Sequence, residues 1–439
     1  MSERMTARRG GSFLLAEREL DVASGAAIFR YELDGDGFEE VVHVPGGGAV
    51  DDPAALDLLL DLCHVAMGTS YFKLSAPKRL RFKRPTAPAI IELARHLYDD
   101  GLREFAVTNG LGVPLTTDID AVADEPLPAV VPRGERALIP IGGGKDSAAM
   151  LGIVPHATAL AVGATEAHER LAAAAGVDLV RVERTLDPLL AQRTATGMNG
   201  HIPVTAINSS LSVLVAALHG YDFVVMGNER SASEPTVVVD GVPVNHQWSK
   251  SFACEALLHN TVAPSGVVYF SLLRQCSELT IAGLVARNVR LRPNFLSCNR
   301  AFKLSRERGQ PQVWCLDCPK CFFTFLCFAP FVTPAAAVHI FGGDPLTDAA
   351  NVDGFADLWR AKPFDCVGER GESAFAMAWL AELDGWKRHA VVEALAAEAA
   401  SIADGLGVTR DAVLTTHGPH LVPVTLHARV TAAVAQLRP

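Results

Sequence analysis

A glycine-rich segment, Ile141-Gly142-Gly143-Gly144-Lys145-Asp146-Ser147, most constrains how this chain can fold. It follows an apolar run at 137–141 that is typical of a buried strand, and it opens a helical pattern at 146–154. Glycines let backbone N–H groups approach a ligand closely, and the unpaired N–H groups at a helix N-terminus attract anions. The segment therefore predicts a strand, loop and helix that bind a phosphate group.

Strands and helices continue to alternate beyond this loop. The predicted strands cover 157–162, 178–182 and 223–226, and the predicted helices cover 166–175 and 204–218. Short apolar strands that alternate with helices indicate βαβ units and a parallel sheet. We expect a doubly wound α/β fold for the middle of the chain.

The flanking regions have different patterns. Alternating residues at 27–33, turn residues Asp34-Gly35 and a second apolar run at 38–42 predict a β-hairpin, and helical spacing follows at 56–67 and 90–98. A proline-rich stretch at 125–132 suggests a boundary. The expected organisation is a mixed α+β domain (1–130), an α/β phosphate-binding domain (131–330) and a mainly helical region (331–439), with helices at 374–383 and 391–406.

Charge and hydropathy narrow the class of partner. The chain has 439 residues, a formal net charge of −10 and 49% hydrophobic residues. An acidic chain lacks the Lys and Arg excess that neutralises nucleic-acid phosphates, so a small-molecule substrate is expected and nucleic acid is not. The polar start has no signal-peptide pattern, and no apolar run approaches the roughly 18 residues of a membrane span. We expect a cytoplasmic protein with no membrane association; the sequence leaves its oligomeric state open.

The spacing of the glycine loop separates it from other phosphate loops. It fits neither Gly-x-x-x-x-Gly-Lys-Ser/Thr nor Gly-x-Gly-x-x-Gly. It resembles the Ser-Gly-Gly-x-Asp-Ser loop of the PP-loop ATP pyrophosphatase superfamily, with Gly142 in place of the first serine. The resemblance, over about residues 136–230, implies a fold of the PP-loop type, ATP as ligand and cleavage at the α-phosphorus that releases pyrophosphate.

The same resemblance implies a set of nucleotide contacts. Lys145 is expected to compensate for the hydroxyl that Gly142 lacks. Gly163 ends the second strand, where related proteins hold adenine, and Asn228 and Glu229 follow the 223–226 strand as phosphate or magnesium contacts. The expected nucleotide-binding residues are Gly142, Gly143, Gly144, Lys145, Asp146, Ser147, Gly163, Asn228 and Glu229.

Four of the nine cysteines lie close together as Cys298-x16-Cys315-x2-Cys318-x2-Cys321. In a reducing compartment this spacing indicates metal ligation rather than disulfides. Four thiolates suit tetrahedral zinc with no open position, which predicts a structural site; an iron–sulfur cluster uses the same ligands and stays open as an alternative. A similar cysteine arrangement occurs in PP-loop enzymes that make 7-cyano-7-deazaguanine.

Segments rich in polar and aromatic residues give a closer resemblance. They cover 68–73, 199–205, 244–251, 269–274, 297–302 and 362–369. Together they resemble the UDP-N-acetylmuramoyl-L-alanyl-L-glutamate epimerases of the MurL type, over about residues 25–375. This family resemblance implies inversion of the terminal L-glutamate of a UDP-linked muramoyl dipeptide, with consumption of ATP and magnesium and release of AMP and pyrophosphate.

The chemistry that the resemblance implies needs two proton-transfer groups. Adenylation of the α-carboxylate removes a negative charge and lets the neighbouring C–H bond ionise, and developing enolate charge needs positioned donors or cations. The candidates for acid and base are His201, His246 and Lys250, with Cys254 less favoured. Arg274 and Arg300 are expected to bind substrate carboxylate or pyrophosphate, and Tyr71 and Lys73 to bring the N-terminal domain over the site.

Three other functions stay open at this stage. Another PP-loop ligase or nucleobase-modifying enzyme would share the adenylation and differ in the second step. A nucleotide sensor without catalysis would explain the missing serine at Gly142. A zinc-dependent hydrolase is less consistent with four cysteine ligands, because its metal needs an open coordination position.

Overall fold

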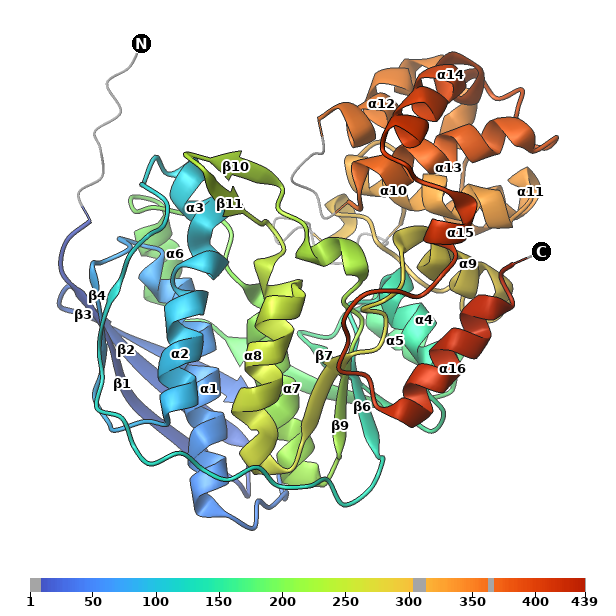
Figure 1. The fold of residues 1–439 in the computed structure, drawn as a ribbon. Helices are drawn as coiled ribbons and strands as arrows, with labels where there is room; N and C mark the ends of the chain where they lie inside the picture. The colour runs from blue at the N-terminus through green and yellow to red at the C-terminus, as the bar shows by residue number, and fades with distance from the viewer. Residues whose placement is uncertain (1–8, 303–312, 362–366, 439) are drawn as a thin grey trace.

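The computed structural model describes residues 9–302, 313–361 and 367–438, and its centre is one ten-stranded sheet (Figure 1). The strand order is β12-β9-β6-β7-β8-β3-β2-β1-β4-β5. The first five of these strands are mutually parallel: β12 (Val268–Ser271), β9 (Phe223–Met226), β6 (Ala137–Pro140), β7 (Thr158–Val162) and β8 (Leu179–Thr185). The doubly wound α/β expectation is confirmed.

The order of the parallel strands identifies the ligand-binding edge. The chain runs from β6 outward through β7 and β8, then crosses back to β9 and β12 on the other side of β6. The direction of winding reverses between β6 and β9, and open α/β sheets bind ligands at the carboxyl ends of strands at such a switch point. The loops after Pro140 and Met226 lie at this edge.

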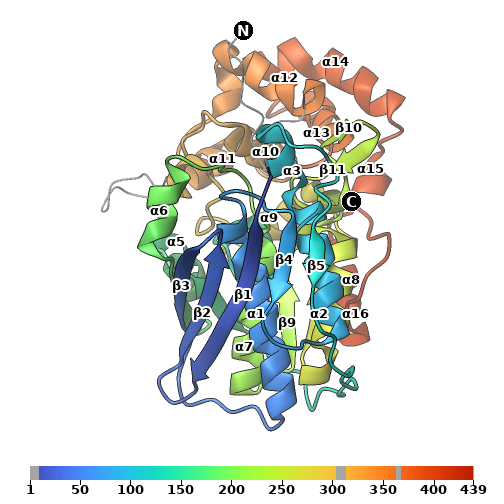
Figure 2. The same cartoon turned by 90° about the vertical axis from the view of Figure 1, so that its left-hand side faces the viewer.

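The N-terminal strands extend the same sheet. Strands β1 (Ser12–Asp21), β2 (Ala26–Leu33) and β3 (Asp36–His43) form an antiparallel meander, which confirms the predicted hairpin, and β4 (Arg79–Phe82) and β5 (Asp118–Asp120) lie beyond β1 (Figure 2). Strand β3 pairs antiparallel with β8 through Val41–His43. The regions expected on either side of residue 130 therefore share one sheet.

Helices cover both faces of the sheet. One apolar core joins the sheet to α1 (Pro53–Phe72), α2 (Pro88–Leu97), α7 (Val204–His219) and α8 (Phe252–Val262), and the other joins it to α4 (Lys145–Ile153), α5 (Glu166–Ala175), α9 (Glu278–Arg287) and α16 (Val424–Ala435). Within β6, Ile139 belongs to one core and Leu138 to the other, because successive strand side chains point to opposite faces. Asp52 caps α1 and Pro53 occupies its first position, which favours the start of a helix here.

The C-terminal region is helical, as expected, and packs against α9 (Figure 1). Its helices are α10 (Pro319–Phe328), α11 (Pro334–Phe341), α12 (Val352–Arg360), α13 (Arg370–Glu382), α14 (Ala390–Gly405) and α15 (Arg410–Val413). The other α-helices and strands are α3 (Arg103–Thr108), α6 (Pro188–Thr194) and a small hairpin of β10 (Val237–Val239) and β11 (Val242–Val244), and short 3-10 helices lie between the main elements. Among the described residues, no helix combines the length and apolar character needed to cross a bilayer.

Candidate active site

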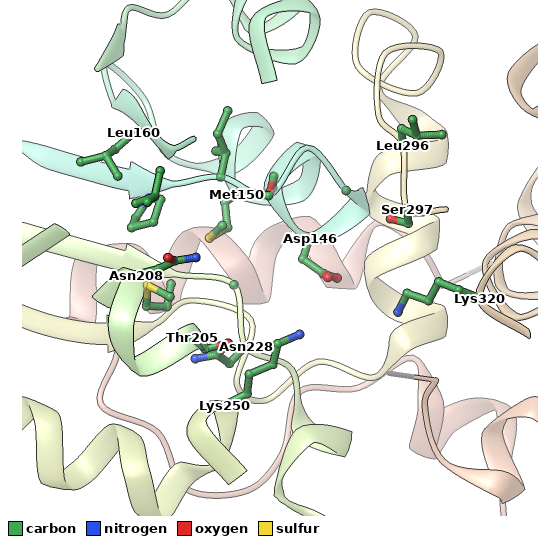
Figure 3. Close-up of a pocket in the computed structure, with 18 of the residues that line it drawn as sticks. Asp146, Met150, Leu160, Thr205, Asn208, Asn228, Lys250, Leu296, Ser297 and Lys320 are labelled. Atoms are coloured by element: carbon green, nitrogen blue, oxygen red, sulfur yellow. The ribbon is translucent and has the colours of Figure 1, made fainter. Parts of the chain in front are cut away.

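A cavity of about 290 Å³ opens at the switch point of the sheet (Figure 3). Its walls come from the loop after β6, the loop after β9, the N-terminal end of α7 and the segment before the cysteine cluster. The polar residues that line it are Asp146, Ser147, Thr205, Asn208, Asn228, Lys250, Ser297, Asn299 and Lys320. A volume close to 300 Å³ lies at the lower end of the range for small-molecule sites.

The glycine loop forms one wall of this cavity. Gly142 and Gly144 line it, while Gly143 turns the chain with a φ of +77°, which favours glycine. The Gly142 N–H donates to Ser147 Oγ at 3.0 Å, and Gly144 caps α4. The first-turn N–H groups of α4 therefore start at the cavity wall, where they are suited to an anion.

The side chain of Lys145 has its described contacts within the protein. It is fully buried and forms ion pairs with Asp146 and Glu278, and it is absent from the cavity lining. Its ammonium is thus held between two carboxylates. Lys250 and Lys320 line the cavity instead, and Figure 3 shows the Lys320 amine directed towards Asp146.

Asp146 is the carboxylate that lines the cavity among the described residues. Burial favours its neutral form, but the charges of Lys145, Lys320 and Lys250 outweigh that effect and hold the pKa of Asp146 below its ordinary value. The group is therefore ionised at neutral pH. A partly exposed, charged carboxylate that lines the cavity is able to hold a phosphate-bound cation.

The other predicted nucleotide contacts divide into two groups. Asn228 lines the cavity and donates to Ser271 Oγ at 2.9 Å. Glu229 is 3% exposed and is not part of the lining, so its direct contact with phosphate or magnesium stays a prediction. Gly163 has a φ of +65° at the end of β7, where Leu160 and Val162 supply the lining.

His201 and His246 lie together in a second polar cluster beside the cavity. Their ring centroids are 4.5 Å apart, and both Nδ1 atoms face Glu104 Oε2 on α3: His246 through a hydrogen bond, and His201 at 3.8 Å. Sequence reasoning missed Glu104, because no local motif connects α3 to two distant loops. His201 precedes the cavity residue Thr205 by four residues, and His246 precedes Lys250 by the same number.

Positive charge surrounds this cluster. Burial, the neighbouring His246 ring and the charges of Lys250 and Lys73, only partly opposed by Glu104, lower the pKa of His201 to about 4. His201 is therefore neutral at neutral pH and able to accept a proton. Lys73 Nζ donates to Asn199 Oδ1 at 2.7 Å, which anchors the loop that carries His201.

Three candidate residues have structural positions instead of ligand-facing ones. Tyr71 is fully buried and stacks on Tyr31 in the N-terminal core. Arg274 is 3% exposed and pairs with Glu255. Cys254 is fully buried, and burial raises the pKa of its thiol well above the ordinary value. The described contacts of these three side chains are internal, and their roles towards a substrate stay predictions.

The four cysteines converge on one point. All four Sγ atoms lie within 4.8 Å of one another, and Cys315 Sγ is 3.7 Å from Cys321 Sγ. Four sulfurs bound to one tetrahedral zinc at about 2.3 Å would lie about 3.8 Å apart. The geometry fits a single ion, whereas the ligands of a multi-iron cluster bind different atoms and lie farther apart.

The cysteine cluster also shapes the cavity. Ser297 and Asn299 flank Cys298 in the chain, and Lys320 directly precedes Cys321 at the start of α10. All three of these neighbouring residues, Ser297, Asn299 and Lys320, line the cavity. Arg300 is half-exposed and pairs with Asp317 at 2.7 Å, next to the cluster and outside the cavity lining. A metal held here would fix one cavity wall without touching the ligand.

The fold and the cavity define a doubly wound α/β protein with a small-molecule site at its topological switch point. Comparison with protein families refines this class. The model of the MurL N-terminal domain matches residues 4–272, and the model of the MurL C-terminal domain matches residues 294–408. The chain belongs to the MurL family of epimerases.

Curated relatives with the same family name match this chain over nearly their whole length. Proteins named UDP-N-acetyl-alpha-D-muramoyl-L-alanyl-L-glutamate epimerase are 40% identical in Micromonospora sp. (95% of this chain, 97% of the relative), 40% identical in Salinispora tropica (95% and 94%) and 37% identical in Xanthomonas oryzae pv. oryzae (97% and 98%). No solved structure matches the chain significantly. The segment at 362–366, part of the resemblance on which the sequence analysis relied, lies outside the described residues.

Proposed function

We propose that this protein uses ATP to invert the terminal L-glutamate of UDP-MurNAc-L-Ala-L-Glu to D-glutamate, for peptidoglycan precursor synthesis. The α-carboxylate attacks the α-phosphorus of ATP, pyrophosphate leaves, and the acyl adenylate ionises at its α-carbon. Return of a proton to the opposite face and hydrolysis give AMP and the inverted product. The substrate is the one that the names of the relatives specify.

The observation that carries this proposal is that Lys250 links an anion-binding cavity to a cluster of proton-transfer groups. A cavity with a glycine loop, helix N-terminus, Asp146 and two lysines suits the triphosphate of a nucleotide. Lys250 belongs to this cavity, and its charge also reaches His201 in the histidine cluster. An anion-binding site beside proton-transfer groups is what activation followed by epimerisation requires.

Adenylation explains why an epimerase would carry a nucleotide site. Removal of an α-proton beside a free carboxylate would place a carbanion next to an existing negative charge. An acyl adenylate has lost that charge, and its carbonyl oxygen can accept the electron pair. Ammonium groups in a buried site stabilise such an oxyanion more strongly than they would in water.

Metal ions are part of the proposal. Magnesium bound to the ATP phosphates would be held by Asp146 and would neutralise charge at the α-phosphorus. Zinc bound by Cys298, Cys315, Cys318 and Cys321 would be structural, because four protein ligands leave no position for substrate. The distances between the sulfurs support a single ion at this site.

The test incubates the protein with ATP, magnesium and UDP-MurNAc-L-Ala-L-Glu in deuterated water, with the D-Glu isomer and a no-substrate sample as controls. Pyrophosphate and AMP formation, deuterium at the glutamate α-carbon and appearance of D-glutamate would support the proposal. Pyrophosphate release without deuterium would keep adenylation and exclude epimerisation. No turnover by folded, metal-loaded protein would favour a nucleotide sensor.

A further inference from the structure

The two histidines of the cluster are in direct contact with each other. Ring centroids 4.5 Å apart, with a 44° angle between the planes, leave no room for a substrate atom between the rings. An epimerase must reach the α-carbon from two opposite faces, with each reacting atom about 3–3.5 Å from the carbon. His201 and His246 therefore cannot stand on opposite faces of the same carbon.

Glu104 joins the histidines into one unit. Its carboxylate accepts a hydrogen bond from His246 Nδ1, which leaves His246 Nε2 as the basic nitrogen of the neutral ring. His201 Nδ1 lies 3.8 Å from the same oxygen. The three side chains are between 14% and 27% exposed, so each of them is partly buried and still accessible to solvent.

The loops that carry the histidines are fixed in place. Asn109 Nδ2 donates to the carbonyl of Asn199 at 2.9 Å, two residues before His201. The backbone N–H of His246 donates to Thr236 Oγ1 at 3.2 Å. Such anchoring holds proton-transfer groups within the narrow range of positions that catalysis requires.

Lys250 approaches from the other site. It lies four residues after His246 in the chain, yet it belongs to the nucleotide cavity with Asn228 and Thr205 (Figure 3). Its position is set by Arg274, whose guanidinium donates to the Lys250 carbonyl. Lys250 lines this cavity, whereas His201, His246 and Glu104 do not, so the two sets of groups would approach a substrate carbon activated there from different directions.

We infer that Glu104, His201 and His246 act as a single proton-transfer unit on one face of the substrate α-carbon, with Lys250 as the acid and base on the opposite face. This assignment rests on the proposed function. In one direction the α-C–H bond breaks, its proton moves to a histidine nitrogen, and its electron pair moves to the carbonyl oxygen of the adenylate. The Lys250 ammonium then donates a proton to the α-carbon, and solvent restores both groups. Glu104 is a positioning residue.

The test measures α-deuterium exchange separately from each isomer. His201→Asn, His246→Asn, Glu104→Gln and Lys250→Met variants receive ATP, magnesium and either the L-Glu or the D-Glu substrate in deuterated water. All three changes in the histidine unit should slow exchange from the same isomer by about a hundredfold or more, with exchange from the other isomer retained. Lys250→Met should show the reverse isomer preference.

Controls separate this inference from the function on which it rests. Pyrophosphate release by the unmodified protein tests adenylation itself, and its absence would reject the proposed function. For each variant, the exchange rate is divided by the rate of pyrophosphate release, so that a slower first step in Lys250→Met, whose side chain also lines the nucleotide cavity, is not counted as a loss of proton transfer. Exposed His156→Asn and Lys387→Met should exchange both isomers at normal rates.

Two results would overturn the inference. Loss of exchange from opposite isomers in His201→Asn and His246→Asn would put the two rings on different faces. Loss from the same isomer in Lys250→Met and His246→Asn would remove Lys250 from the opposite face. For Glu104→Gln, an equal loss from both isomers would assign Glu104 a general structural role.

Discussion

Arg274 and Glu255 form an ion pair at 2.7 Å that is almost completely buried, with side-chain exposures of 2% and 0%. The same guanidinium donates to the carbonyl oxygens of Glu229 and Lys250. Glu255 also accepts a hydrogen bond from the Ser271 N–H at 2.9 Å. One buried pair thus connects α8, the end of β12 and the backbone that presents Lys250 to the cavity.

Removal of Arg274 should destabilise the protein and disturb Lys250. Arg274→Met leaves the Glu255 charge buried without its partner, which typically costs about 3–5 kcal/mol of unfolding free energy. Urea denaturation measures the change. Arg274→Met/Glu255→Gln should regain part of the loss, because the buried charge is gone and the glutamine oxygen can still accept from Ser271. A double variant no more stable than Arg274→Met would contradict this explanation.

Gly144→Ala should weaken ATP binding. A Cβ atom at this position would lie 2.6 Å from Ser297 Oγ, so the cavity wall would have to move. We expect a loss of tenfold or more in affinity, or about 1.4 kcal/mol, by titration calorimetry. Gly152→Ala in the same helix meets only the ends of two side chains, at 3.3 Å and 3.5 Å, and should bind ATP normally. Equal affinities for the two variants would refute the steric argument.

Much of the fold could be predicted because its signals are local. The alternation of short apolar strands with helices placed α5 at 166–175 and β9 at 223–226 with the bounds that the structure has. The pairing of β3 with β8 could not be predicted, since it joins segments far apart in sequence and leaves no local pattern. The expected boundary near residue 130 therefore interrupts a continuous sheet.

The candidate site was only partly predictable for the same reason. The glycine loop and the cysteines carry their chemistry in their spacing, and both sets converge in space. Single polar residues carry no signal of burial, so the sequence does not reveal that Tyr71 and Arg274 lie in the interior. Glu104 lies on a short helix with no motif, and only the fold brings it to the two histidines.

Glu372 should make stability depend on pH. Burial, then the nearby charges of Glu278 and Glu369, raise its pKa from 4.5 to about 8 in the folded protein. Between these values the folded state holds a proton that the unfolded state has lost, so stability falls as pH rises, with a slope approaching 1.4 kcal/mol per pH unit. Glu372→Gln should remove this slope in urea denaturation from pH 5 to 8.

A matched change on the same helix controls for this effect. Glu382 on α13 is 66% exposed in its side chain and pairs with Arg410 at the surface. Glu382→Gln should leave the pH dependence close to that of the unmodified protein. A slope unchanged by Glu372→Gln would show that Glu372 is ionised in the folded state.

Metal removal should affect ATP binding through the cavity wall. Ser297, Asn299 and Lys320 are each next to a cysteine of the cluster, so a bound ion would hold all three in place. Cys298→Ser should lose the one zinc expected per chain, measured by elemental analysis, and should bind ATP at least tenfold more weakly. Cys276→Ala alters a buried cysteine outside the cluster and should retain its zinc. A structural ion should stabilise both the fold and the cavity wall, so loss of zinc should lower thermal stability and ATP affinity together. A zinc-free variant with normal ATP affinity would show that the cysteine cluster does not support the cavity.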